Sequence, residues 1–103
     1  MIYIKIHDSE NGKIVGMCDS SLIDKVLTEG DLEINIKDYS EFYIGELVTA
    51  DKAVTMLDPQ KIYSANIIGK ESVDAAIRSN IIHKDGVMKV GKTPYANAFK
   101  IKY

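Results

Sequence analysis

The decapeptide GVMKVGKTPY, residues 86–95, matches the P-loop pattern G-x-x-x-x-G-K-[ST], whose backbone and lysine hold nucleotide phosphates. A working P-loop follows a strand and opens a helix at its lysine. Here strand-forming residues fill the loop positions, and Pro94 leads into a segment with a period of two. We therefore interpret the match as a strand, a turn and a second strand, and expect no nucleoside triphosphate to bind.

The end of the chain is basic and offers a second chemistry, contact with a phosphate backbone. Its candidate phosphate-binding residues are Lys84, Lys89, Lys92, Lys100 and Lys102, interleaved with Tyr95, Phe99 and Tyr103. Lysines with exposed aromatic rings are what single-stranded RNA requires. Against this, the period-two pattern places the three aromatic residues on the face we expect to be buried. Lysines on an edge strand also have a simpler role, protection against aggregation.

Charge is distributed unevenly along the chain. Residues 1–58 carry five lysines and twelve acidic residues, a net charge of −7, whereas residues 59–103 carry eight basic and three acidic residues, a net charge of +5. The total is only −2 and the isoelectric point about 5.6, which is low for a general nucleic-acid binder. Because a partner meets a local patch, the uneven layout matters more than the total.

A third candidate is a small anion or ligand site where a strand leads through Gly69 into a helix, residues 66–73. The free N–H groups of a helix start attract anions, and Lys70 adds charge. The segments Cys18-Asp19 and Phe42–Glu46 could complete such a site. The residues we assign to it are Asp19, Glu46, Asn66, Gly69 and Lys70.

Other chemistry has little support in the sequence. Cys18 is the single cysteine, so no internal disulfide or cysteine-based zinc site can form. His7 and His83 lie far apart without acidic residues at ligand spacing, and we expect neither a metal nor a cofactor. No apolar run approaches the roughly 18 residues of a membrane span. The amino terminus reads as a strand and not as a signal peptide, so we expect a cytoplasmic protein with no membrane partner.

The elements that would position these residues can be predicted from periodicity and turn signals. We expect strands at 2–7, 13–19, 32–37, 62–69, 86–90 and 95–103, helices at 20–30, 50–57 and 70–80, and a strand or ordered loop at 41–47. This order predicts one α+β domain over residues 1–103. It would have a mixed or mostly antiparallel sheet of about five to six strands with three short helices.

Four segments together resemble, in order and spacing, domain of unknown function 424, a family of small, mostly archaeal proteins of about this length. They are MCDSSLIDKVLTEG, EFYIGEL, ANIIGKESVDAAI and VMKVGKTPYANA. The resemblance implies a compact archaeal cytoplasmic protein and no assigned activity. The family pattern has a second glycine where this chain has Ile44 and a histidine where it has Tyr95. If that histidine were functional, its chemistry would be in doubt here.

Three functional hypotheses follow. The first is a non-enzymatic binding module whose basic carboxyl-terminal hairpin contacts RNA or a ribonucleoprotein such as the ribosome. The second is a ligand-binding or enzymatic site formed by Cys18-Asp19, Phe42–Glu46 and the helix start at Gly69. The third is a self-associating domain, a homo-oligomer in which acidic and basic surfaces pair between copies.

Overall fold

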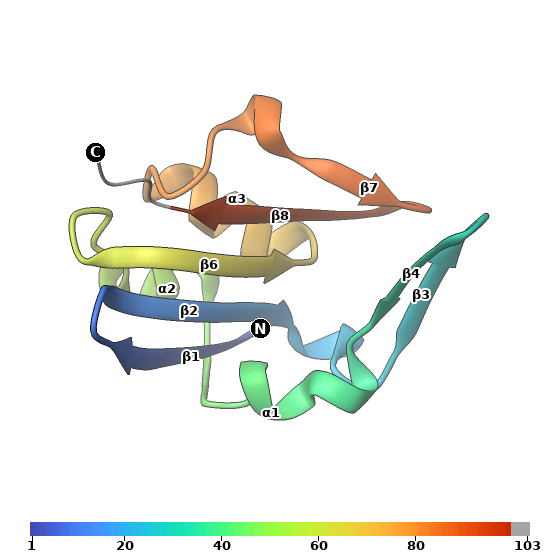
Figure 1. Ribbon diagram of the computed structural model, residues 1–103, viewed down its shortest axis with the longest axis horizontal. Helices are drawn as coiled ribbons and strands as arrows, with labels where there is room; N and C mark the ends of the chain where they lie inside the picture. The colour runs from blue at the N-terminus through green and yellow to red at the C-terminus, as the bar shows by residue number, and fades with distance from the viewer. Residues whose placement is uncertain (100–103) are drawn as a thin grey trace.

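A six-stranded mixed sheet organises the computed structural model, which describes residues 1–99 (Figure 1). The strand order is β5-β1-β2-β6-β8-β7; β2 and β6 are parallel, and all other neighbours are antiparallel. The strands are β1 (Ile2–Ser9), β2 (Gly12–Asp19), β5 (Glu46–Val48), β6 (Ile62–Ile68), β7 (Met88–Val90) and β8 (Thr93–Phe99). The fold is α+β, as the order of predicted elements indicates.

The hairpin of β1 and β2 forms where the alternating sequence predicts it. The register pairs Ile2 with Asp19 and Ser9 with Gly12, so the turn contains Glu10 and Asn11. Gly12 has φ of +134°, a backbone conformation that a residue with a side chain rarely adopts. This register brings Asp19 to the end of the sheet where β6 also ends.

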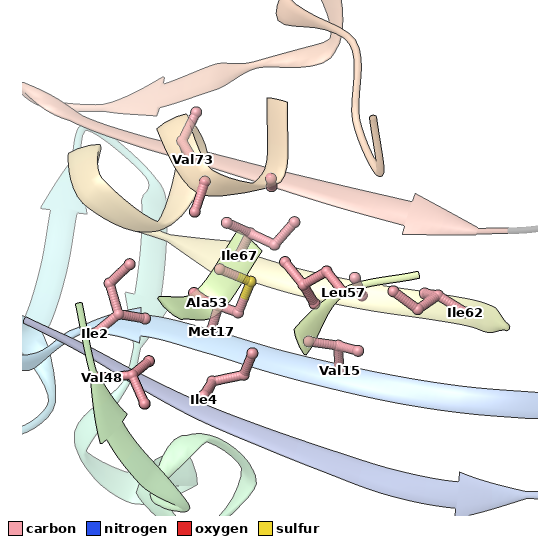
Figure 2. Packing of buried hydrophobic residues seen from close by; sticks show 13 residues of the cluster. Ile2, Ile4, Val15, Met17, Val48, Ala53, Leu57, Ile62, Ile67 and Val73 are labelled. Atoms are coloured by element: carbon pink, nitrogen blue, oxygen red, sulfur yellow. The ribbon is translucent and has the colours of Figure 1, made fainter. Parts of the chain in front are cut away.

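Helices α2 (Ala50–Met56) and α3 (Lys70–Arg78) cover one face of the sheet. The start of α2 is stabilised by Thr49, whose hydroxyl accepts a hydrogen bond from the Lys52 N–H at 3.1 Å. Figure 2 shows the core between the sheet and the helices, where Met17 and Ile67 are fully buried near Val73. Within residues 1–99 no helix has the length and apolar character needed to cross a membrane.

The other face of the sheet is covered only in part, by helix α1 (Ser40–Tyr43) and the chain beside it. The Phe42 ring stacks on the His7 ring at 4.9 Å, and the Lys5 ammonium donates to the Glu41 carbonyl at 2.9 Å. Gly16 lies directly under α1, and a Cβ at this position would be only 2.5 Å from the Phe42 carbonyl oxygen, so a larger residue would not fit. This close approach places α1 against β1 and β2, and within residues 1–99 no helix covers β6 and β8 on this side.

The predicted helix at 20–30 is wrong. Only a single 3₁₀ turn, η1 (Ser20–Leu22), forms there, and the chain continues into a two-stranded sheet of β3 (Val26–Glu29) and β4 (Leu32–Asn35). Gly30, with φ of +58°, forms the turn between these strands instead of ending a helix. The β-branched residues Val26 and Thr28 favour a strand, and the Glu29 carboxylate accepts a hydrogen bond from the Gly91 N–H at 2.8 Å. Tertiary contact with the β7–β8 turn thus stabilises the hairpin.

Two further segments resolve alternatives that the sequence leaves open. The aromatic segment at 41–47 divides into the end of α1 and the start of the edge strand β5. The P-loop match forms β7, a turn in which Gly91 has φ of +59°, and β8. A strand therefore occupies the place of the helix that a P-loop requires after its lysine.

We predict that Gly16→Ala lowers the free energy of unfolding by about 1–3 kcal/mol, because the added methyl group would displace the backbone of α1. Urea denaturation measures the change. Gly86→Ala is the matched control, since nothing lies within 4 Å of a Cβ at that position. Equal stability of the two variants would show that α1 does not rest on Gly16.

Candidate nucleic-acid interface

Three of the lysines predicted to bind phosphate lie along the β7 edge of the sheet. Lys84 begins the 3₁₀ turn η3 (Lys84–Gly86), Lys89 is in β7, and Lys92 is in the β7–β8 turn. All three side chains are exposed, and none has an ion-pair partner within residues 1–99. Lys100 and Lys102, also predicted to bind phosphate, lie outside the described residues.

Two other basic side chains of the fold, Arg78 and Lys13, are paired with acidic ones. Arg78 contacts Asp51 at 2.7 Å and Asp74 at 3.6 Å, and Lys13 pairs with Asp8. Their charge is offset locally, so they attract an anionic partner weakly. The three lysines of the β7 edge have no such partner within residues 1–99, so their positive charges add along one side of the sheet.

Asp19 lies at the start of α3 and has a structural role there. Its carboxylate accepts hydrogen bonds from the Glu71 N–H at 3.1 Å, the Ser72 N–H at 2.8 Å and the Ser72 hydroxyl at 2.8 Å. Gly69, at φ of +109°, leaves room for it, because a Cβ there would overlap the Asp19 carboxyl group. A side chain from β2 thus caps the helix that follows β6. The Asp19 carboxylate accepts hydrogen bonds from the N–H groups that the sequence predicts to bind an external anion.

A hollow of about 250 Å³ lies beside this cap. It is lined by Asp19, Gly69 and Lys70 from the predicted anion site and by Lys92 from the predicted phosphate-binding group, together with Ser21, Leu22, Thr93 and Pro94. The structure therefore joins two sets of residues that the sequence treats separately. Lys70, which is exposed and has no ion pair within residues 1–99, extends the basic edge from the β7–β8 turn to the start of α3.

Glu46 and Asn66, the remaining members of the predicted anion site, lie elsewhere. Glu46 is exposed on the edge strand β5, opposite Ile4 of β1. Asn66 of β6 pairs with Gly16 of β2 on one side and with Asn97 of β8 on the other. Side chains alternate along β6, so Asn66 lies on the sheet face away from α3. Asp19, Glu46 and Asn66 thus do not converge on one pocket, which removes the geometric basis we had expected for that site.

The expectation that the aromatic residues of the last strand are buried is wrong for Phe99. Its side chain is 68% exposed, whereas Tyr95 is half-buried and packs on the cluster around Ile68; Tyr103 lies outside the described residues. The period-two pattern places Tyr95 and Phe99 on one face correctly. It does not reveal that this face is covered at only one end.

Two residues beside Phe99 were missed by sequence reasoning. Tyr63 contacts Phe99 edge to face at 4.9 Å, and Asn97 precedes Phe99 by two positions on the same strand face. Both line a second hollow, of about 400 Å³, together with His83. The sequence places Tyr63 in the predicted apolar strand 62–69 and Asn97 in the predicted strand 95–103, but nothing local marks either as part of a site.

Cys18, the single thiol, is fully buried beneath α1 with Tyr43. Burial, with a smaller contribution from the negative charge of Asp19, raises the pKa of Cys18 from 9.0 to about 12. The thiol is therefore not a nucleophile near neutral pH. No cluster of three or more metal-ligating side chains forms anywhere in residues 1–99.

Together these features define a small α+β domain with a basic edge and a partly uncovered sheet face. The chain belongs to the family described as protein of unknown function (DUF424), whose sequence profile matches residues 6–101. A crystal structure of an uncharacterized conserved protein from Methanopyrus kandleri is similar, with a TM-score of 0.77 and 15% sequence identity over 99% of this chain and 96% of that one. At this identity the likeness shows the fold. No curated protein matches the chain.

We predict that Asp19→Ala lowers the free energy of unfolding by about 2–3 kcal/mol, because two N–H groups and a buried hydroxyl lose their acceptor. Urea denaturation followed by circular dichroism measures this loss. The exposed Asp24→Ala should change stability by less than about 0.5 kcal/mol. A denaturation midpoint for Asp19→Ala equal to that of the parent would contradict the capping role.

We also predict that stability falls as the pH rises above about 9. Since the folded protein raises the pKa of Cys18 to about 12, the unfolded thiol ionises first, and the stability from the neutral buried thiol is lost between these values. Unfolding free energies measured from pH 7 to pH 11 test this. Burial likewise raises the pKa of Tyr43 from 10.0 to about 12, so ionisation of Tyr43 in the unfolded chain adds to the loss of stability above pH 10. Cys18→Ala should therefore delay the onset by about one pH unit, and an unchanged onset would contradict the assignment.

Proposed function

We propose that this protein is a non-enzymatic module that binds RNA, free or in a ribonucleoprotein, through contacts to the phosphate backbone. The observation that carries the proposal is the row of exposed lysines without ion pairs, Lys84, Lys89 and Lys92 along the β7 edge and Lys70 at the start of α3. Lysine ammonium groups on a surface of this kind contact successive phosphates.

The distribution of charge supports a directional contact. The β3–β4 hairpin carries Glu29, Asp31 and Glu33 on its exposed surface, and the basic edge begins where Glu29 meets the β7–β8 turn. A polyanion would be repelled by the hairpin and attracted by the edge. The acidic total charge of the chain is therefore compatible with a local phosphate surface.

Three groups that could carry out catalysis have other contacts or are buried. Asp19 uses its carboxylate to cap α3, Cys18 is buried, and the His83 Nδ1 accepts a hydrogen bond from the Asp85 N–H at 3.2 Å. Within residues 1–99 these groups do not converge on one hollow with a base, a nucleophile and a charge stabiliser. This arrangement supports binding over catalysis.

The test is the binding of single-stranded RNA, measured by fluorescence anisotropy from about 50 mM to about 200 mM salt. Four lysine–phosphate contacts predict a slope of about −3 in log K against log salt. The triple variant Lys84→Gln, Lys89→Gln and Lys92→Gln should reduce the slope by about 2 and weaken binding strongly at low salt. The matched control replaces Lys25, Lys37 and Lys52, which are exposed and line neither of the two hollows, with glutamine and should bind like the parent.

Absence of salt-dependent binding by the parent at micromolar protein would exclude the proposal. Equal losses in the two triple variants would mean that attraction is general and does not involve the β7 edge. Light scattering at both salt concentrations separates RNA binding from self-association. An oligomer that dissociates at high salt would indicate instead that the acidic hairpin and the basic edge pair between copies.

A further inference from the structure

Strand β8 has an open edge beside the lysines. Strand β7 pairs with β8 only through Thr93–Tyr95, so within the described residues no strand continues this side of the sheet along Ala96–Phe99. The hollow of about 400 Å³ lies there, between this edge and the segment that leads from α3 to η3. Figure 1 shows this segment above the end of β8, away from the acidic hairpin.

An aromatic platform forms one side of this hollow. The Phe99 ring is held by Tyr63, whose ring meets it edge to face at 4.9 Å and 61°, yet 68% of the Phe99 side chain is exposed. A nucleobase stacked on this ring would remove the apolar faces of both from water. The contact with Tyr63 fixes the orientation of the ring before any ligand arrives.

Polar groups beside the ring favour an occupant that can form hydrogen bonds. The Asn97 amide lines the hollow and has no hydrogen-bond partner within residues 1–99. His83 lines it as well, with Nδ1 engaged by Asp85 and Nε2 without a partner in that same range. A nucleobase offers a flat apolar face together with donors and acceptors at its edge, which matches a phenyl ring next to an amide. A purely apolar protein segment would leave these polar groups without partners.

The basic edge begins next to the hollow. Lys84 lies in the chain between His83 and Gly86, which both line the hollow, and its side chain is exposed without an ion pair in the described region. In a duplex the bases are stacked and paired, and only an unpaired nucleotide can present its base face to Phe99. The charge of Lys84 and the ring of Phe99 therefore point to the same type of ligand.

We propose that the hollow formed by Tyr63, His83, Asn97 and Phe99 receives an unpaired base of single-stranded RNA. The base stacks on Phe99, its edge bonds to the Asn97 amide, and its phosphate lies near Lys84. This inference rests on the proposed function, because it names the form of RNA that the basic edge selects.

The experiment compares a labelled single strand of about twelve nucleotides with the same strand annealed to its complement. Fluorescence anisotropy at low salt should give tighter binding of the single strand by the parent protein. Phe99→Leu should weaken single-strand binding about tenfold with the salt slope unchanged, and Phe99→Tyr should restore it. The matched control is Tyr39→Leu, because Tyr39 is a 67% exposed aromatic residue in η2 (Lys37–Tyr39), on another surface. Urea denaturation verifies that all variants fold.

Each outcome separates the two proposals. If Phe99→Leu binds like the parent while the lysine variant loses affinity, the base site is excluded and phosphate binding stands. Equal affinity of the parent for single strand and duplex also excludes the base site. If the parent binds neither form, the proposed function fails and this inference fails with it. Equal effects of Phe99→Leu and Tyr39→Leu would show that the hollow is not the contact.

Discussion

The hydrogen bonds from the start of α3 to the Asp19 carboxylate join segments 52 and 53 residues apart in the chain. They connect the end of β2 to the helix that follows β6, the two strands that form the parallel pair of the sheet. Parallel neighbours have no tight turn between them, so their relative position depends on such long-range contacts. With Asp19 in place, Lys70 lies next to the β7–β8 turn, and the basic edge is assembled from distant parts of the sequence.

The unequal cover of the two faces of the sheet follows from the same arrangement. Helices α2 and α3 bury one face completely enough that Met17 and Ile67 have no exposed surface. Within the described residues, the opposite face is covered by the short helix α1, which Gly16 admits close to the backbone, and by the cluster around Cys18. Phe99 lies beyond the reach of this cover. The part of this sheet face around Phe99 is therefore exposed.

Sequence patterns predicted well what depends on local chemistry. Alternation identified the β1–β2 hairpin, the period of two after Pro94 argued against a P-loop, and the segment that leads through Gly69 into a helix located α3. The helix expected at 20–30 failed because the β-branched residues Val26 and Thr28 favour a strand, and the Glu29 carboxylate of that strand accepts a hydrogen bond from the β7–β8 turn. The role of Asp19 could not be predicted, because nothing local marks a carboxylate that caps a helix from another strand.

The candidate site was also predictable only in part. The sequence selects Lys84, Lys89 and Lys92 as candidates from lysine content and Lys70 from the helix start. Only the fold shows that these four residues share an edge. Glu46 and Asn66 are candidates because of their residue types alone, and the sequence does not show that one lies on the edge strand β5 and the other in β6. The exposure of Phe99 depends on which segments cover a sheet, and this is a tertiary property that periodicity does not contain.

A titration of the ¹⁵N-labelled protein with single-stranded RNA, followed through its amide resonances, tests the central claim most directly. The account predicts that shifts concentrate at residues 83–99 and at Lys70, with the β3–β4 hairpin unaffected. Because a chain of 11.5 kDa gives well-resolved spectra, every described strand is reported in one experiment. A spectrum unchanged at saturating RNA, or shifts confined to β1, β5 and α2, would contradict it.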